Sequence, residues 1–183
     1  MALPSTLHHF DVRLSHVDRG VDLDLAIKAA RHPSETMERL WLRVVAFCWQ
    51  WEETIAFGPG VSEPDEPDLF ALGADGTTRT LLCRVGRPEV SRIEKDCARG
   101  SGARVAVLFD SARRLEAFLA EARTGRPERV ARAVLAALPD DLLKALVLHD
   151  GRRQRLGLTL VDGHLYLDLD GETLEGALIL GRP

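Results

Sequence analysis

The sequence lacks the features that mark several common classes of protein. Its three cysteines, Cys48, Cys83 and Cys97, are far apart and form no CxxC or Cys/His pattern, so we expect free thiols rather than a zinc site. Every long apolar segment carries charged residues, which excludes a membrane span. The first residues have neither the basic start nor the apolar stretch of a signal peptide. We therefore expect a cytoplasmic protein that has no membrane partner.

An excess of one charge is also missing. The chain has 24 lysines and arginines against 28 aspartates and glutamates, which gives a net charge of −4. A weakly acidic chain does not bind nucleic acid through its bulk charge, so any such contact needs a local basic patch. A glycine-rich phosphate loop is absent too, because Gly58-Pro59-Gly60 is not followed by a lysine and a helix.

What is present is an ordinary globular composition. The 183 residues are 45% hydrophobic and 28% charged, which suits one domain with a sizeable core. No internal repeat, low-complexity tract or clear linker interrupts the chain, so we expect a single domain over residues 1–183. Strand-like and helix-like patterns both occur, which predicts a mixed α/β or α+β fold.

The elements can be placed from the spacing of the apolar residues. Alternation over residues 10–14 and 21–27, with a turn at residues 18–20, predicts an opening β-hairpin. Three- and four-residue steps from Met37 to Trp51 predict an amphipathic helix lying on a sheet, and Ser34 is the candidate N-cap. The further elements expected are strands over 54–57, 69–72, 78–86 and 103–109, helices after 86–88 and over 111–123 and 127–137, and a segment 138–148 that begins as a helix and ends strand-like.

The C-terminal part is expected to form an antiparallel meander. Leucines alternate with other residues over 156–160 and again over 165–169. Asp162-Gly163 and Asp170-Gly171 have the composition of two-residue hairpin turns. Residues 174–180 are predicted to form the last strand.

Several short strings follow one another in a specific order. Residues 30–36 read ARHPSET. The others are Glu38-Arg39 with Arg43, Asp65-Glu66-Pro67, Val85-Gly86, Pro88, Arg92-Ile93 and Lys95. In this order, over nearly the whole chain, they resemble the signature of the bacterial YaeQ family. The resemblance implies a restriction-endonuclease-like variant of the PD-(D/E)xK nuclease fold, with a central mixed β-sheet flanked by helices.

The same resemblance implies a nuclease-like site. Nucleases of this fold hold Mg²⁺ with carboxylates and place a lysine near the attacking water. The residues that would correspond are Glu35 or Glu38 and Lys95 as catalytic groups, and Asp65 and Glu66, or Asp68, as metal ligands. Mg²⁺ is the only cofactor implied.

One departure weakens the expectation of catalysis. The resemblance places a second acid just before Val85-Gly86, where this chain has Arg84. A guanidinium in place of a carboxylate changes the local charge by about two units and removes a ligand. We therefore expect a degenerate metal site. Arg84 either pairs with Glu35 or Asp65 in a metal-free network or holds a phosphate.

The arginines of these strings are candidates for contact with an anionic substrate: Arg31, Arg39, Arg43, Arg84 and Arg92. Simpler roles fit as well. Glu35 suits the positive end of a helix, and Glu38, Arg39 and Arg43 have the spacing of a surface network of ion pairs.

Three functions follow from the sequence. The first is binding of nucleic acid or a phosphorylated ligand, with cleavage weak or lost. The second is an active Mg²⁺-dependent phosphodiesterase, in which another carboxylate such as Glu66 or Glu89 replaces the missing ligand. The third is a non-enzymatic protein that meets a protein partner through exposed strand edges or its acidic loop. The Arg84 departure favours the first.

Overall fold

The computed structural model describes residues 4–99 and 102–182. Its first sheet, sheet A, contains five strands in the order β10-β9-β8-β1-β2. β1 pairs with β8 in parallel, and the other neighbours in sheet A are antiparallel. The bounds are β1 Thr6–His16, β2 Val21–Arg31, β8 Arg153–Val161, β9 His164–Leu169 and β10 Glu172–Ala177. The opening hairpin and the C-terminal meander are thus parts of one sheet.

The second sheet, sheet B, contains six strands in the order β11-β7-β6-β5-β4-β3. Its central strands β5, β6 and β7 are parallel, and the outer ones pair antiparallel. The bounds are β3 Ala56–Phe57, β4 Leu69–Leu72, β5 Arg79–Gly86, β6 Arg104–Phe109, β7 Ala133–Ala137 and β11 Ile179–Gly181. A mixed α+β fold is confirmed, and its strands form two mixed sheets.

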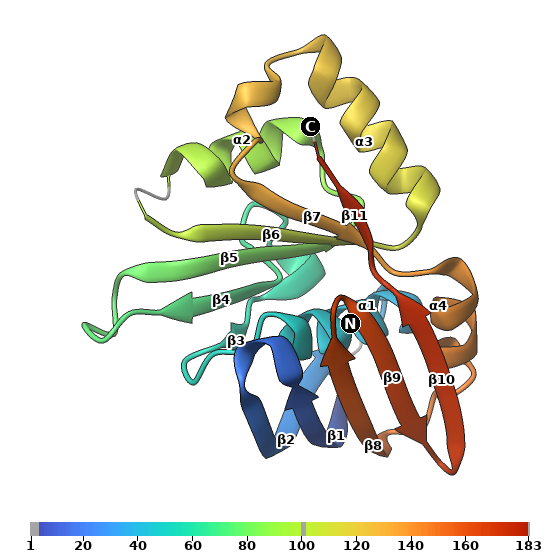
Figure 1. Ribbon diagram of the computed structural model, residues 1–183. Coiled ribbons are helices and arrows are strands. Elements are labelled where there is room, and N and C mark those ends of the chain that lie inside the picture. The colour runs from blue at the N-terminus through green and yellow to red at the C-terminus, as the bar shows by residue number, and fades with distance from the viewer. Residues whose placement is uncertain (1–3, 100–101, 183) are drawn as a thin grey trace.

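The four helices of the described residues lie in two layers, as Figure 1 shows. Helices α1 (Met37–Trp49) and α4 (Asp140–Val147) lie between the sheets, whereas α2 (Val90–Arg99) and α3 (Ala112–Thr124) cover the other face of sheet B. Short 3₁₀ turns, η1 (Val17–Arg19), η2 (Gly60–Ser62) and η3 (Pro127–Arg129), occupy connections. In the described parts of the chain, no helix has the length and apolarity needed to cross a lipid bilayer.

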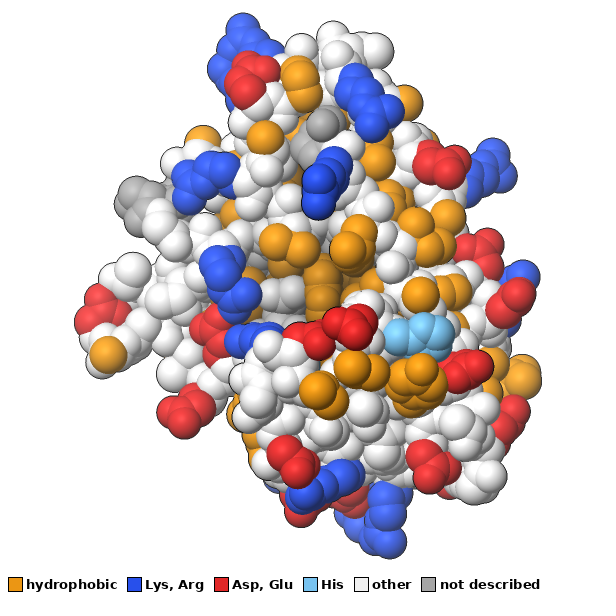
Figure 2. Space-filling model, in the orientation of Figure 1, with side chains coloured by type: hydrophobic (Ala, Val, Ile, Leu, Met, Phe, Trp, Pro, Cys, Tyr) orange, Lys and Arg blue, Asp and Glu red, His pale blue; other side chains and the backbone are white. Residues whose placement is uncertain are grey.

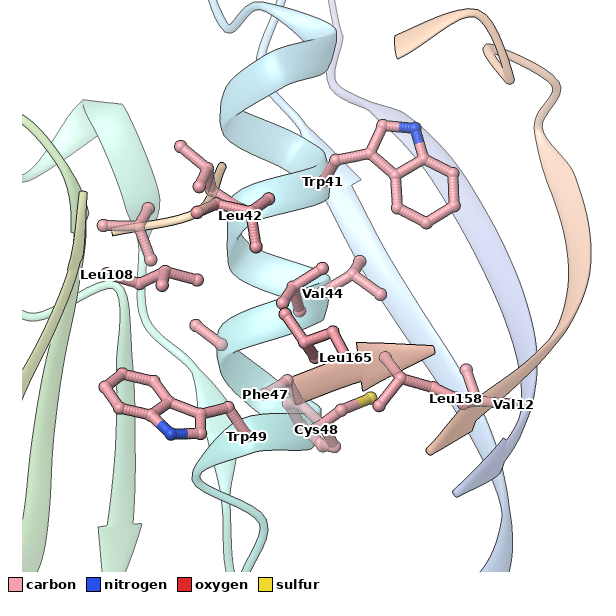
Figure 3. Close-up of a cluster of buried hydrophobic side chains, with 14 of the residues drawn as sticks. Val12, Trp41, Leu42, Val44, Phe47, Cys48, Trp49, Leu108, Leu158 and Leu165 are labelled. Carbon is pink, nitrogen blue, oxygen red and sulfur yellow. The ribbon is translucent and has the colours of Figure 1, made fainter. Parts of the chain in front are cut away.

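Helix α1 is the centre of the larger core. The spacing of its apolar residues predicts an amphipathic helix that lies on one sheet. In the structure residues 40–49 are all buried, so the helix is covered on every side. Figure 3 shows Leu42 directed toward Leu108 of sheet B, and Trp41 and Cys48 directed toward sheet A. The Nε1–H of Trp41 donates a hydrogen bond to the carbonyl of His149, 3.1 Å away. The apolar faces of both sheets therefore meet through this one helix.

The turns and caps follow ordinary chemistry, with one difference from prediction. Asp162 and Asp170 have positive φ and are each followed by a glycine with positive φ, as the predicted two-residue turns require. The N-cap of α1 is Thr36, whose Oγ1 accepts a hydrogen bond from the backbone N–H of Arg39. Ser34 instead hydrogen-bonds the ring of His32, so the helix begins two residues later than predicted.

The prediction of a helix over 127–137 is wrong. Residues 133–137 form β7, which lies between β6 and β11. Leu135 and Ala137 belong to the core under α3, and Ala136 belongs to the core around α1, so the end of the strand is buried on both faces. Val134 is exposed but also apolar, so all five residues of the strand are apolar. A strand buried on both faces has a continuous apolar run, which resembles a buried helix in sequence.

The last predicted elements differ in a related way. The end of segment 138–148 is not strand-like, because α4 continues to Val147. The last strand is split at Leu178, whose N–H donates to the carbonyl of Gly163. The residues before Leu178 complete sheet A as β10, and those after it form β11 at the edge of sheet B.

We expect Leu40→Ala to lower the free energy of unfolding by about 2–5 kcal/mol, because Leu40 is 0% exposed and its loss leaves a cavity between the sheets. Leu148→Ala is the matched control: that side chain is 83% exposed, and we expect a change within about 0.5 kcal/mol. Urea unfolding followed by tryptophan fluorescence measures both. Equal effects of the two substitutions would contradict the enclosed position of α1.

A second expectation concerns pH. His8 and His16 lie on the buried face of β1, and desolvation lowers the pKa of both below the ordinary value of 6.5. Below pH 6.5 these imidazoles bind protons more readily in the unfolded chain than in the folded protein. The free energy of unfolding should therefore fall as the pH drops. The loss should reach at most about 1.4 kcal/mol per pH unit for each histidine. Urea unfolding from pH 7.5 to 5 should show a shallower slope for His8→Gln/His16→Gln.

Candidate functional site

A cavity of about 560 Å³ opens where α1 begins, beside the end of β5. Its walls come from three segments, residues 36–42, 60–68 and 84–92, with Asp110 added from the end of β6. These segments are far apart in sequence and are brought together because α1 packs against β5. The cavity wall therefore contains residues from most of the short sequence strings on which the resemblance depends.

The floor of this region is an ion-pair cluster at the start of α1. Glu35 accepts hydrogen bonds from Arg39 (Oε1–Nη1, 3.2 Å) and from Arg43 (Oε2–Nη2, 2.7 Å). Arg39 also pairs with Asp68, whose second oxygen accepts the N–H of Val85 at 2.8 Å. Both oxygens of Glu35 and both oxygens of Asp68 thus accept hydrogen bonds. Both residues are 5% exposed, which makes this pairing necessary for their burial.

Arg43 lies behind this cluster and is itself 2% exposed. Its Nη2 also donates to the carbonyl of Ala30 at 2.7 Å, and its guanidinium carbon lies 5.4 Å from the centre of the Phe57 ring. Desolvation lowers the pKa of Arg43 and the charge of Glu35 opposes this shift, so the guanidinium stays charged. Arg43 is a buried structural cation rather than a member of a surface network.

Arg84 uses all five of its N–H donors inside the protein. Its Nε and Nη2 bind the carboxylate of Asp96, at 2.5 and 3.2 Å. The remaining bonds go to the carbonyls of Pro64, Asp65 and Glu66, at 2.9–3.1 Å. Arg84 therefore fastens the acidic loop to α2. Arg84 does pair with a carboxylate, but the partner is Asp96 rather than Glu35 or Asp65, which the sequence suggested.

The outer arginines of the cavity make fewer contacts. Arg92 donates to the carbonyl of Pro64 and to the carboxylate of Asp65, the latter at 3.3 Å. The Nε of Arg87 donates to Asp110 at 2.6 Å, while 60% of the Arg87 side chain is exposed. The outer wall is therefore more open to a ligand than the floor.

The structure brings together some of the residues proposed from sequence and separates others. Of the catalytic candidates, Glu35 is buried in the floor and Glu38 is exposed on the cavity wall, whereas Lys95 is exposed and outside the wall. The metal candidates have arginine partners instead: Asp65 pairs with Arg92, and Glu66 pairs with Arg79 at 2.6 Å.

The five substrate candidates divide in the same way. Arg39, Arg84 and Arg92 line the cavity. Arg43 lies behind Arg39, and Arg31, at the end of β2, is not part of the wall and has a buried Nε without a hydrogen-bond partner.

The residues present do not fit a bound Mg²⁺. A magnesium ion needs several converging oxygen ligands that are not already neutralised. In residues 4–99 and 102–182, no three His, Cys, Asp or Glu side chains converge in a way that could hold a metal. The carboxylates of Glu35, Asp68 and Asp96 are occupied by arginines, and Arg84 stands where the second acid is expected.

Sequence reasoning missed two residues of this region. Asp96 follows Ile93 by three residues and precedes Cys97, so it lies beside the inward face of α2, and this spacing could have indicated a buried charge. Asp110 follows the last residue of β6 and reaches Arg87 only through the parallel pairing of β5 and β6, which no local pattern reveals.

Comparison with known proteins places these features in a family. The family model described as YaeQ protein matches residues 1–178. The uncharacterized protein YaeQ of Escherichia coli K12 is 30% identical over 175 residues, which are 96% of this chain and 94% of that protein. Its counterpart in Salmonella typhi is 31% identical over the same shares.

Solved structures agree with this assignment. The crystal structure of the YaeQ protein from Xanthomonas axonopodis pv. citri has a TM-score of 0.87 at 26% identity, and the match covers 97% of this chain and 98% of that one. The YaeQ protein from Pseudomonas syringae has a TM-score of 0.86 at 29% identity, covering 98% and 97%. The likeness therefore includes both sheets.

We expect Arg84→Met to lower the free energy of unfolding by about 3–5 kcal/mol, because Asp96 is left buried and unpaired. The added substitution Asp96→Leu should restore part of this loss. Arg87→Met is the control, since it removes an exposed arginine with one partner and should cost no more than about 1 kcal/mol. Urea unfolding of the four proteins compares them, and similar losses at positions 84 and 87 would count against the role of Arg84.

Proposed function

The chain belongs to the YaeQ family, and from this premise we propose that it binds a small phosphorylated ligand in the cavity beside Arg87 and Arg92, without metal-dependent hydrolysis. The observation that carries the proposal is a difference between the arginines. Arg39 and Arg43 of the floor bind buried carboxylates through their terminal nitrogens. Arg87 of the outer wall is 60% exposed and binds Asp110 through Nε, so its terminal nitrogens face outward without a hydrogen-bond partner in the described part of the chain.

The free donors lie on adjacent parts of the wall. Both terminal nitrogens of Arg87 and the Nη2 of Arg92 are in this state. A guanidinium presents its N–H groups in a planar fork that matches two oxygens of a phosphate group. Arg87 lies in the segment that connects β5 to α2 and Arg92 lies in the first turn of α2, so the two groups can engage one phosphate group from two directions.

The size and charge of the cavity favour a small ligand over a nucleic acid. Its volume of about 560 Å³ is typical of small-molecule sites. Its wall also carries carboxylates, among them Glu38 and Glu89, and the chain has a net charge of −4. Basic and acidic side chains are interspersed on the face drawn in Figure 2, without an extended basic surface. A polymer with many phosphates would meet these acids, whereas a single phosphate group can lie against the arginines alone.

The nuclease-like origin of the fold belongs to the same proposal. Three parallel strands, β5 to β7, with helices on both faces of sheet B are consistent with the restriction-endonuclease-like core that the sequence resemblance implies. The paired carboxylates and Arg84 then represent a site that keeps the affinity for phosphate and lacks the ligands for Mg²⁺.

Calorimetric titration at low salt, with pyrophosphate and a panel of nucleoside monophosphates and sugar phosphates, tests this proposal. We expect saturable binding of at least one probe, weakened roughly tenfold to a hundredfold by Arg87→Gln and by Arg92→Gln, because each removes charged hydrogen bonds. Arg129→Gln is the matched control: it also removes a half-exposed arginine with one acidic partner, Glu94, but away from the cavity, and should bind normally.

Other results would contradict the proposal. The absence of binding to every probe would refute a phosphate site, and equal binding by all three variants would place it elsewhere. Phosphate release that requires added Mn²⁺ would refute the non-hydrolytic part. Tighter binding of an oligonucleotide than of its mononucleotides would favour nucleic acid as the ligand.

A further inference from the structure

Strand β2 is the outermost strand of sheet A and pairs only with β1 in the described part of the chain. It extends over residues 21–31 at the open side of the sheet, as Figure 1 shows. Alternate residues of such a strand direct their N–H and C=O groups away from the sheet, where they can pair with another strand. We propose that two copies of this chain associate by antiparallel pairing of their β2 strands about a two-fold axis at Ala26.

The register follows from the geometry of a sheet. Facing residues in an antiparallel pair project from the same side, so a symmetric pairing must match residues of the same parity. Centring the axis on Ala26 gives the longest overlap of the two strands, with Val21 opposite Arg31 of the second copy. The carbonyl of Ala30 already accepts a hydrogen bond from Arg43, so the new backbone hydrogen bonds are expected over the central part of β2, from Asp24 to Lys28. The axis itself passes between two alanines, which permit close approach.

The charges on the outer face agree with this register. Asp22, Asp24 and Lys28 are exposed along the strand. In the register centred on Ala26, Asp24 faces Lys28 of the second copy, and by symmetry the contact occurs twice. Asp22 faces Ala30. No like charges oppose one another, whereas moving the axis to residue 24 or 28 would place identical charges face to face.

The inner face is also compatible. Leu25 faces Ile27 of the second copy and Leu23 faces Ala29, so the apolar sides meet. Val21, Leu23 and Leu25 are only half-buried, although they belong to the face that packs on the core. A second strand beside them would cover their exposed flank and add to the buried apolar area.

Charged residues on an edge strand usually prevent pairing. Here the same residues have an order along the strand, acidic in the first half and basic in the second, that makes the strand complementary to its own reversed copy. Arg13 of β1 already contacts Asp22 and Asp24, at 2.8 and 3.3 Å, which holds both carboxylates on the outer face. Asp24 would therefore lie between a cation of its own chain and one of the second copy.

Sedimentation equilibrium of the full-length chain, over a wide concentration range, tests the proposal. We expect a concentration-dependent dimer. Lys28→Asp and Asp24→Lys should each weaken it by about tenfold or more, because each places two pairs of like charges face to face. An equimolar mixture of these two variants should dimerise again, since every facing pair then has opposite charges.

Asp22→Lys is the matched control. It removes the same kind of contact with Arg13 as Asp24→Lys does, but position 22 faces Ala30, so the dimer should persist. A wild-type protein that stays monomeric at all concentrations would overturn the proposal. So would a dimer that Lys28→Asp leaves unchanged, one that Asp22→Lys and Asp24→Lys weaken equally, or a mixture that stays monomeric.

Discussion

Enclosure of α1 between two sheets is the constraint on which the rest of the structure depends. A helix covered on every side can carry charged residues only where other groups supply opposite charges at short distance. Arg39 and Arg43 satisfy this requirement through Glu35 and Asp68, which arrive from the segment before the helix and from the end of the acidic loop. The floor of the cavity therefore lies at the edge of the core, where the buried charges of α1 are neutralised by ion pairs.

Arg84 is a second buried cation that a carboxylate neutralises, in this case that of Asp96. Its planar group joins a helix to a loop with five hydrogen bonds, a task that a divalent ion performs in many other proteins. A guanidinium can hold carbonyl and carboxylate oxygens together, but it cannot activate a water molecule as a metal does. The carbonyls of the acidic loop are thus held by a side chain of the protein itself. The open wall of the cavity is left to Arg87 and Arg92.

Local patterns predicted much of this fold and little of the site. The Asp-Gly turns, the opening hairpin and the strand before Gly86 depend on neighbouring residues, so the sequence reveals them. β7 was mistaken for a helix because all five of its residues are apolar, which removes the alternation that marks a strand. The resemblance indicated the segments that meet around Glu35 and Arg84. The choice of Asp96 as the partner of Arg84 depends on how α2 is rotated over sheet B, and a single sequence does not record that rotation.

The route of the chain between the sheets bears on synthesis at the ribosome. β1 pairs with β8, so residues at the start of the chain have their neighbours in its last quarter. The final strands then divide, β10 completing sheet A and β11 the edge of sheet B. Neither sheet is complete until β10 and β11 have been synthesised, and until then the apolar surface around α1 is not fully covered. Loss of the residues that follow β9 would therefore take an edge strand from each sheet, so a truncation there weakens both halves of the molecule at once.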